Sequence, residues 1–145
     1  MTTDAALMKA RLAPFKDFQE CVLRDIRWRE FALSVDFIFN NIWDRQGGIR
    51  KDLGSRDDLV TVSFNLIQEF RFRAGLNESM CRKPELINWG INEVATIQIL
   101  DDSATLEPYR SLPIPFHHAV ISWEWERRID MVFSSMLVVP ERPSY

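Results

Sequence analysis

FALSVDFIF, residues 31–39, is the stretch that decides the fold class. Large apolar side chains occupy all of its odd positions, and Ala, Ser, Asp and Ile lie between them. Because a strand places alternate side chains on opposite faces, this period of two predicts a strand with one buried face and one mostly wetted face. The side chains expected on the buried face are Phe31, Leu33, Val35, Phe37 and Phe39.

Other segments show the same alternation. Apolar residues recur on even positions up to Trp28, and only two residues separate Trp28 from Phe31, so we expect a tight hairpin there. Residues 119–133 alternate around a charged break, which predicts a second hairpin. Residues 94–100 predict one more strand, because apolar positions recur until two aspartates end the pattern.

Residues 59–73 carry a longer alternating pattern with one break. Its apolar row runs up to Leu66 and resumes at Phe70 and Phe72. Ile67 falls on the polar row, and Gln68 interrupts the apolar one. We interpret the break as either a β-bulge or a strand that changes sheets.

Strands follow one another without helical segments between them, which favours antiparallel pairing. We therefore predict a single, mainly β domain over residues 1–145 (α+β at most), whose antiparallel hairpins form a curved sheet or a sandwich. Residues 1–14 predict a short N-terminal helix or arm, residues 44–58 a long charged loop, and residues 140–145 a frayed tail. Prolines predict an extended connection over residues 108–115.

Composition excludes several classes of protein. With 46% hydrophobic and 12% aromatic residues the chain is not disordered. A net charge of -3 argues against a strongly basic nucleic-acid binder. No stretch reaches the roughly 20 apolar residues of a membrane span, and no signal peptide is recognisable, so we expect a cytoplasmic protein with no membrane contact. Cys21 and Cys81 form no CxxC motif and are expected to be reduced thiols.

No catalytic, metal-binding or cofactor-binding motif emerges. The two histidines, His117 and His118, are adjacent, so on a strand they point to opposite faces and cannot chelate one metal. We interpret them as a loop or strand-edge pair. The phosphate-binding glycine loops and the hydrolase elbow G-x-S-x-G do not occur. The sequence therefore predicts no catalytic residue, no metal and no cofactor.

Two features favour binding to a partner. Basic residues are 14 Arg against 4 Lys, and arginine suits bidentate contacts with carboxylates and phosphates. Arg71 and Arg73 share the wetted face of one strand, where they either contact a partner or pair with carboxylates on neighbouring strands. A tryptophan at the base of the charged loop is a suitable interface anchor. The candidate partner-binding residues are Trp43, Asp44, Asp57, Asp58, Arg71 and Arg73.

The order of segments resembles a known family. FQECVLRDI (residues 18–26) is similar to the opening strand of bacterial immunity proteins of polymorphic toxin systems, of the immunity-protein-50 type. VTVSFNLIQEFRF (residues 60–72) is similar to a later strand of that family, and residues 119–139 to its closing pair of strands. The resemblance implies a non-enzymatic cytosolic inhibitor that binds and blocks a toxin. It implies no particular site residues.

The leading functional prediction is thus a non-catalytic cytosolic protein-binding module, in its most specific form an immunity protein that blocks a cognate toxin. Mild acidity suits a basic partner. One alternative is a single-stranded nucleic-acid-binding β domain, which needs aromatic residues on a wetted face. Another is a small-ligand carrier or enzyme that uses a pocket of the sheet. An exposed strand edge could also pair two copies of the chain as a homodimer.

Overall fold

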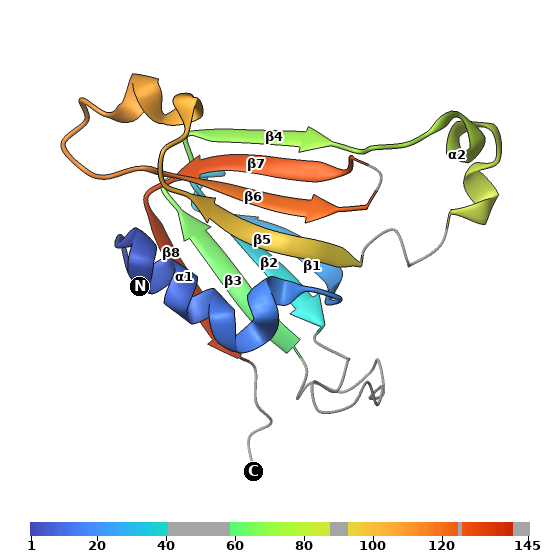
Figure 1. Cartoon of the computed structure of the whole chain (residues 1–145), viewed down its shortest axis with the longest axis horizontal. Coiled ribbons are helices and arrows are strands. Elements are labelled where there is room, and N and C mark those ends of the chain that lie inside the picture. Colours follow the sequence, from blue (N-terminus) through green and yellow to red (C-terminus); the bar gives the residue numbers. More distant parts are fainter. Residues whose placement is uncertain (41–58, 88–92, 125, 141–145) are drawn as a thin grey trace, which may run out of the picture.

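The computed structural model describes residues 1–40, 59–87, 93–124 and 126–140, and in them two four-stranded antiparallel sheets (Figure 1). The mainly β class and the antiparallel sandwich are confirmed. One sheet has the order β1-β2-β3-β8, with β1 Val22–Arg29, β2 Ser34–Asn40, β3 Leu59–Asn65 and β8 Ser135–Pro140. The other has the order β4-β7-β6-β5, with β4 Glu69–Arg73, β5 Val94–Leu100, β6 His117–Trp123 and β7 Arg128–Phe133.

The core lies between the sheets, whose strands cross at a steep angle in Figure 1. Alternate residues of β2, Val35, Phe37 and Phe39, are fully buried, as their period of two predicts. The rings of Phe37 and Phe64 meet edge to face at 5.7 Å. Each such phenyl ring contributes about 1.5–3 kcal/mol to folding through burial.

Helix α1 (Ala5–Leu12) and the 3₁₀ segment η1 (Ala13–Phe18) contact the edge strand β5, and α1 also contacts β8. Met8 and Leu12 on α1 are buried in the same core. The predicted N-terminal helix is therefore present, and it closes one side of the sandwich.

The chain crosses between the sheets at one corner, twice. It passes from β3 to β4 through residues 66–68 and from β7 to β8 through Ser134. The backbone N–H of Ser134 donates to the Asn65 oxygen at 3.0 Å, which fastens the two crossings together. Of the two interpretations of the break in residues 59–73, the change of sheets is the one observed. Leu66 has a positive φ of 56°, which reverses the alternation, so Leu66 is exposed and Ile67 buried, opposite to prediction.

The start of the second strand also differs from prediction. The first hairpin is present, but its turn is longer than two residues and β2 begins at Ser34. Phe31 and Leu33, expected in the core, are exposed instead. The cause is a run of left-handed residues that carries the chain away from the core before β2 starts. Phe72 near the end of β4 is also exposed, because it lies on an edge strand.

The remaining elements follow the sequence pattern with two exceptions. The β6–β7 hairpin and β5 lie where expected. Short helices α2 (Glu78–Arg82) and η3 (Pro84–Leu86) lie between β4 and β5. The proline-rich connection is not simply extended, because it contains a 3₁₀ segment η5 (Ala104–Tyr109) with Pro108 inside it. Pro140, expected in a frayed tail, is the last residue of β8.

Three further observations bear on the sequence predictions. Cys21 is buried and Cys81 exposed, and no disulfide joins these two described residues. No helix in the described part of the chain is long and apolar enough to span a membrane. The charged loop 44–58 and residues 141–145 lie outside the described residues.

Candidate functional site

Four large apolar side chains are exposed where the β1–β2 turn meets the β3–β4 corner. Phe31 is fully exposed, at 102% of its reference area. Trp28, Leu33 and Leu66 are 45%, 47% and 42% exposed. The backbone N–H of Ile67 donates to the Leu33 oxygen at 2.9 Å, so the corner and the turn are joined. We call Trp28, Phe31, Leu33 and Leu66 the apolar rim.

The turn that carries Phe31 is strained. Glu30, Phe31 and Ala32 have φ values of 53°, 59° and 67°, in the left-handed region that favours glycine. For a residue with a Cβ this conformation costs roughly 1–2 kcal/mol. Such strain persists only where neighbouring interactions hold it, and it is concentrated at functional sites.

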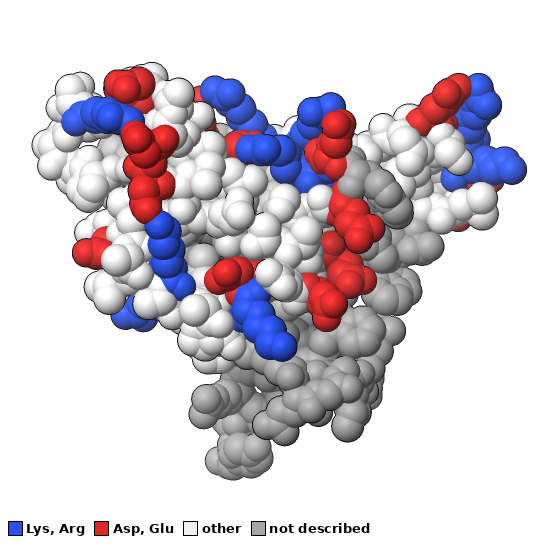
Figure 2. All heavy atoms as spheres, viewed as in Figure 1, with Lys and Arg blue, Asp and Glu red and all other residues white. Residues whose placement is uncertain are grey.

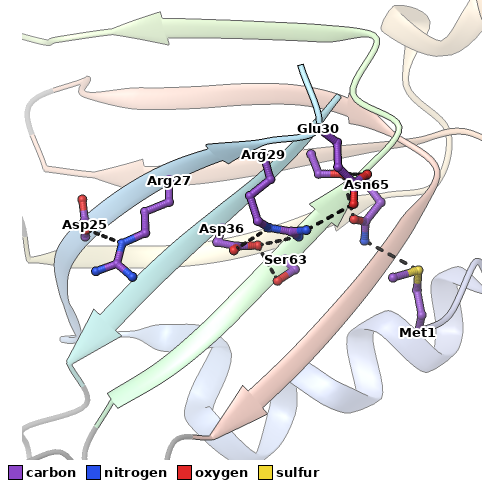
Figure 3. A network of polar contacts seen from close by, with 9 residues as sticks. Met1, Asp25, Arg27, Arg29, Glu30, Asp36, Ser63 and Asn65 are labelled. Atoms are coloured by element: carbon purple, nitrogen blue, oxygen red, sulfur yellow. Dashed lines mark hydrogen bonds and ion pairs between the residues drawn. The ribbon is translucent and has the colours of Figure 1, made fainter. Parts of the chain in front are cut away.

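Hydrogen bonds hold this turn in place (Figure 3). The Leu33 N–H donates to the Glu30 backbone oxygen at 3.1 Å. The Ser34 hydroxyl lies 3.2 Å from a Glu30 carboxylate oxygen and 3.0 Å from the Asn65 side-chain oxygen, which belongs to β3. Because the Ser34 hydroxyl carries one proton, it donates to one of these two acceptors at a time, and it links the end of the turn either to Glu30 or to β3.

At its inner end the rim is packed against the second sheet. The Trp28 ring packs edge to face against Phe70 of β4, with centroids 4.8 Å apart. Isolated exposed apolar residues are normal on protein surfaces, whereas grouped ones mark interaction sites. A preordered aromatic group loses little side-chain entropy on binding, which makes it a suitable anchor.

A polar cluster borders the rim on the outer face of the first sheet (Figure 3). Asp36 of β2 accepts from Arg29 Nε at 2.7 Å and Nη2 at 2.9 Å, and from Ser63 Oγ at 2.7 Å. Burial raises the pKa of Asp36, but hydrogen bonds from Arg29 and Ser63 outweigh it and leave the pKa below its usual value. The carboxylate therefore stays ionised and clamps β1 to β2 and β3.

We expect Asp36→Asn to lower the free energy of unfolding by about 1 kcal/mol at neutral pH, because Arg29 is partly solvated. The pKa of Asp36 is lower in the folded chain than in the unfolded chain, where an aspartate has a pKa of about 3.9. The stabilisation is therefore fully present at pH values above this unfolded-state pKa, and it is lost as the pH falls through the folded-state pKa. Urea unfolding at pH 7 and at about pH 2 measures it. Wild type and variant should differ at pH 7 and converge in acid. A constant difference would contradict the clamp, and Asp25→Asn on the exposed Arg27 pair is the control with a smaller effect.

Of the six residues predicted to bind a partner, the structure describes only two. Trp43, Asp44, Asp57 and Asp58 lie outside the described residues. Arg71 and Arg73 lie on the outer face of β4, where each has a carboxylate partner: Glu69 at 2.6 Å and Glu126 at 2.9 Å. Figure 2 shows basic and acidic side chains mixed over the face in view. The structure brings neither arginine into the apolar rim.

A second polar network lies on the outer face of the other sheet, and sequence reasoning missed it. His118 Nδ1 lies 2.7 Å from Ser103 Oγ, and its Nε2 lies 2.7 Å from an oxygen of Asp130. Arg128 donates Nε and Nη2 to the same carboxylate at 2.7 and 2.6 Å. His118 is only 5% exposed and lies on the interior strand β6, so its interpretation as a loop or strand-edge residue is wrong.

The histidines do point to opposite faces, as expected. His117 Nε2 lies 2.7 Å from the backbone oxygen of Thr3 near α1, on the other side of the sheet from Ser103. Ser103, His118 and Asp130 come together only through the register of β6 with β7 and the fold of the connection before β6. No spacing in the sequence signals that proximity.

Serine, imidazole and carboxylate are linked in the order used by acyl-transfer enzymes. Here the Ser103 oxygen is instead the N-cap of η5, accepting from the Thr105 N–H at 3.2 Å. Thr105 and His118 line the adjoining pocket, and Ser103 is not among the described lining residues. We therefore assign these hydrogen bonds a positioning role, in which they fasten η5 onto the sheet. Within the described ranges, no group of three or more His, Cys, Asp or Glu residues could hold a metal ion.

Comparison with known proteins identifies a likeness of fold and points to no function. No family model matches the chain, and no curated protein matches it. A crystal structure of an uncharacterized protein from Neisseria gonorrhoeae is similar, with a TM-score of 0.51 and 10% sequence identity. The match covers 85% of this chain and 93% of that one. At this identity the likeness concerns the fold alone.

Proposed function

We propose that this protein is a binding module whose partner protein covers the apolar rim. The observation that supports this most strongly is Phe31, fully exposed on a turn with three successive left-handed residues. A glycine at this position would relieve the backbone strain, and any small residue would expose less apolar surface to water than phenylalanine does. Burial of the Phe31 ring by a partner would recover about 1.5–3 kcal/mol.

The chemistry of the rim indicates the kind of partner. A protruding aromatic group needs an apolar socket on the other protein. Arg29 and Glu30 beside it are charges of both signs, so the edge of that socket should be polar and near neutral overall. The described arginines Arg29, Arg71 and Arg73 are each paired with a carboxylate, which gives the nucleic-acid alternative little support.

The more specific proposal is an immunity or inhibitor role against a toxin. It is supported only by the resemblance of residues 18–26, 60–72 and 119–139 to the immunity-protein family. The binding proposal does not depend on it. A captured partner with a toxin domain would support the specific role, and a partner of another kind would contradict it.

The test is capture of partners from the native host by tagged wild-type protein, Phe31→Asp and Leu86→Asp. Leu86 is an exposed apolar residue on η3, outside the rim, so its variant is the matched control. We expect one protein to be captured in stoichiometric amount, also after the lysate is treated with nuclease. The wild type and Leu86→Asp should capture this protein, and Phe31→Asp should not. Equal capture by all three proteins would overturn the proposal. If the captured protein is the chain itself, size-exclusion chromatography should show a dimer that Phe31→Asp disrupts.

A further inference from the structure

A polar pocket of about 260 Å³ lies on the outer face of the second sheet, beside η5. Its wall is formed by side chains from the strands β4, β6 and β7 and from the 3₁₀ segment η5. The polar lining residues are Glu69, Arg71, Thr105, His118, Arg128 and Asp130. A cavity below about 300 Å³ is smaller than the usual pocket for a drug-sized ligand, so it suits a small group.

The acceptors of this pocket are already engaged. Glu69 accepts from Arg71 Nη2 at 2.6 Å and from the Tyr109 hydroxyl at 2.9 Å. Asp130 accepts two bonds from Arg128 and one from His118. Both ring nitrogens of His118 are engaged as well. The negative groups and the imidazole thus serve to hold other side chains.

The donors are in surplus. An arginine has five N–H bonds to donate. Arg71 uses one nitrogen, Nη2, on Glu69, and Arg128 uses Nε and Nη2 on Asp130. Both guanidinium groups therefore keep N–H groups for a ligand, and Thr105 on η5 lines the same pocket. Unused hydrogen-bonding capacity here consists mainly of donors that line one small cavity.

We infer that this pocket binds a small oxyanion, the carboxylate or phosphate group of a metabolite, between Arg71 and Arg128. Guanidinium groups match the planar geometry of carboxylates and the oxygens of phosphates. The two arginines balance the two carboxylates in charge, so a bound carboxylate leaves one excess negative charge and a bound phosphate leaves about one to two. The site lies outside the rim and does not depend on the proposed function.

The pocket is preorganised for this task. Hydrogen bonds from Arg128 first, then from His118, lower the pKa of Asp130 against the opposing effect of burial. The Arg71 hydrogen bond, with that of Tyr109, likewise lowers the pKa of Glu69. Both carboxylates stay ionised at neutral pH and fix their arginines before a ligand arrives. Preordered side chains reduce the entropy lost on binding.

The experiment is an NMR titration of the full chain with inorganic phosphate and, separately, with acetate, following the side-chain N–H signals of arginine. The key variant is Arg71→Gln, and Arg73→Gln is its control. Arg73 lies two residues along the same strand and also pairs with one carboxylate, Glu126, but it does not line the pocket. Both side chains are largely exposed, so both variants should fold, which the backbone spectrum verifies.

We expect a saturable shift that weakens about tenfold in Arg71→Gln, stays unchanged in Arg73→Gln, and declines as sodium chloride is added. Saturation by acetate alone would identify a carboxylate ligand, and saturation by phosphate alone a phosphate ligand. Saturation by both would identify a general oxyanion site. No saturable shift with either anion, or equal weakening in the two variants, would overturn the inference.

Discussion

Replacing Phe31 by glycine should weaken partner binding by about 30-fold or more while leaving the domain at least as stable as the wild type. An aromatic anchor at the centre of an interface is worth about 2 kcal/mol or more, which corresponds to that factor. Phe31 is fully exposed, so its removal leaves no cavity. Glycine adopts the observed φ of 59° freely, and this relief exceeds its cost in the unfolded chain by about 0.5–1 kcal/mol. Calorimetric titration with the captured partner and thermal unfolding measure the two effects.

Ala32→Gly is the matched control for this substitution. Ala32 has a φ of 67°, so glycine relieves the same kind of strain while the aromatic ring stays. We expect this variant to gain similar stability and to bind within a few fold of the wild type. If Phe31→Gly loses stability together with binding, the ring is part of the folded structure and not of an interface. If it binds normally, the rim is not the contact surface.

His118→Ala should have the largest effect on stability outside the apolar core. The substitution leaves Ser103 Oγ and the Asp130 carboxylate without their imidazole partner and opens a cavity beneath η5. Loss of two partly buried hydrogen bonds, one of them to a charged group, together with the cavity, costs about 2–4 kcal/mol. Urea unfolding measures the change in free energy, and the exchange of the amide protons of η5 reports whether that segment loosens first.

The adjacent His117→Ala provides the comparison. His117 is less buried, and its ring makes one hydrogen bond, to the Thr3 backbone oxygen, and contacts Phe133 at 5.9 Å. We expect it to cost about 1 kcal/mol and to leave η5 unchanged. Equal effects of the two substitutions would contradict the positioning role given to Ser103, His118 and Asp130.

The period of two was sufficient to predict the strands because burial between two sheets selects for it directly. Val35, Phe37 and Phe39 are buried as their spacing predicts. The pattern failed where the backbone leaves the extended region. Positive φ at Phe31 and at Leu66 reverses or ends the alternation, and the sequence there has no glycine to signal it.

The candidate sites were less predictable than the fold. The alternation predicted Phe31 in the core, because it lies an even number of residues from the buried Phe37. The left-handed backbone of the turn exposes it instead. The polar pocket unites Arg71, His118 and Asp130 from three strands, whose proximity depends on sheet order. Sequence alone placed Arg71 on a wetted face but could not show its pairing with Glu69.

Site-specific photo-crosslinking tests the proposed binding role most directly. A benzophenone amino acid is placed at Phe31 in one sample and at Leu86 in another, both exposed positions in the folded chain. Irradiation in the native host should produce one dominant crosslinked protein from position 31 and none of it from position 86. Crosslinks that are absent at position 31, or the same at both positions, would contradict a partner that covers the apolar rim.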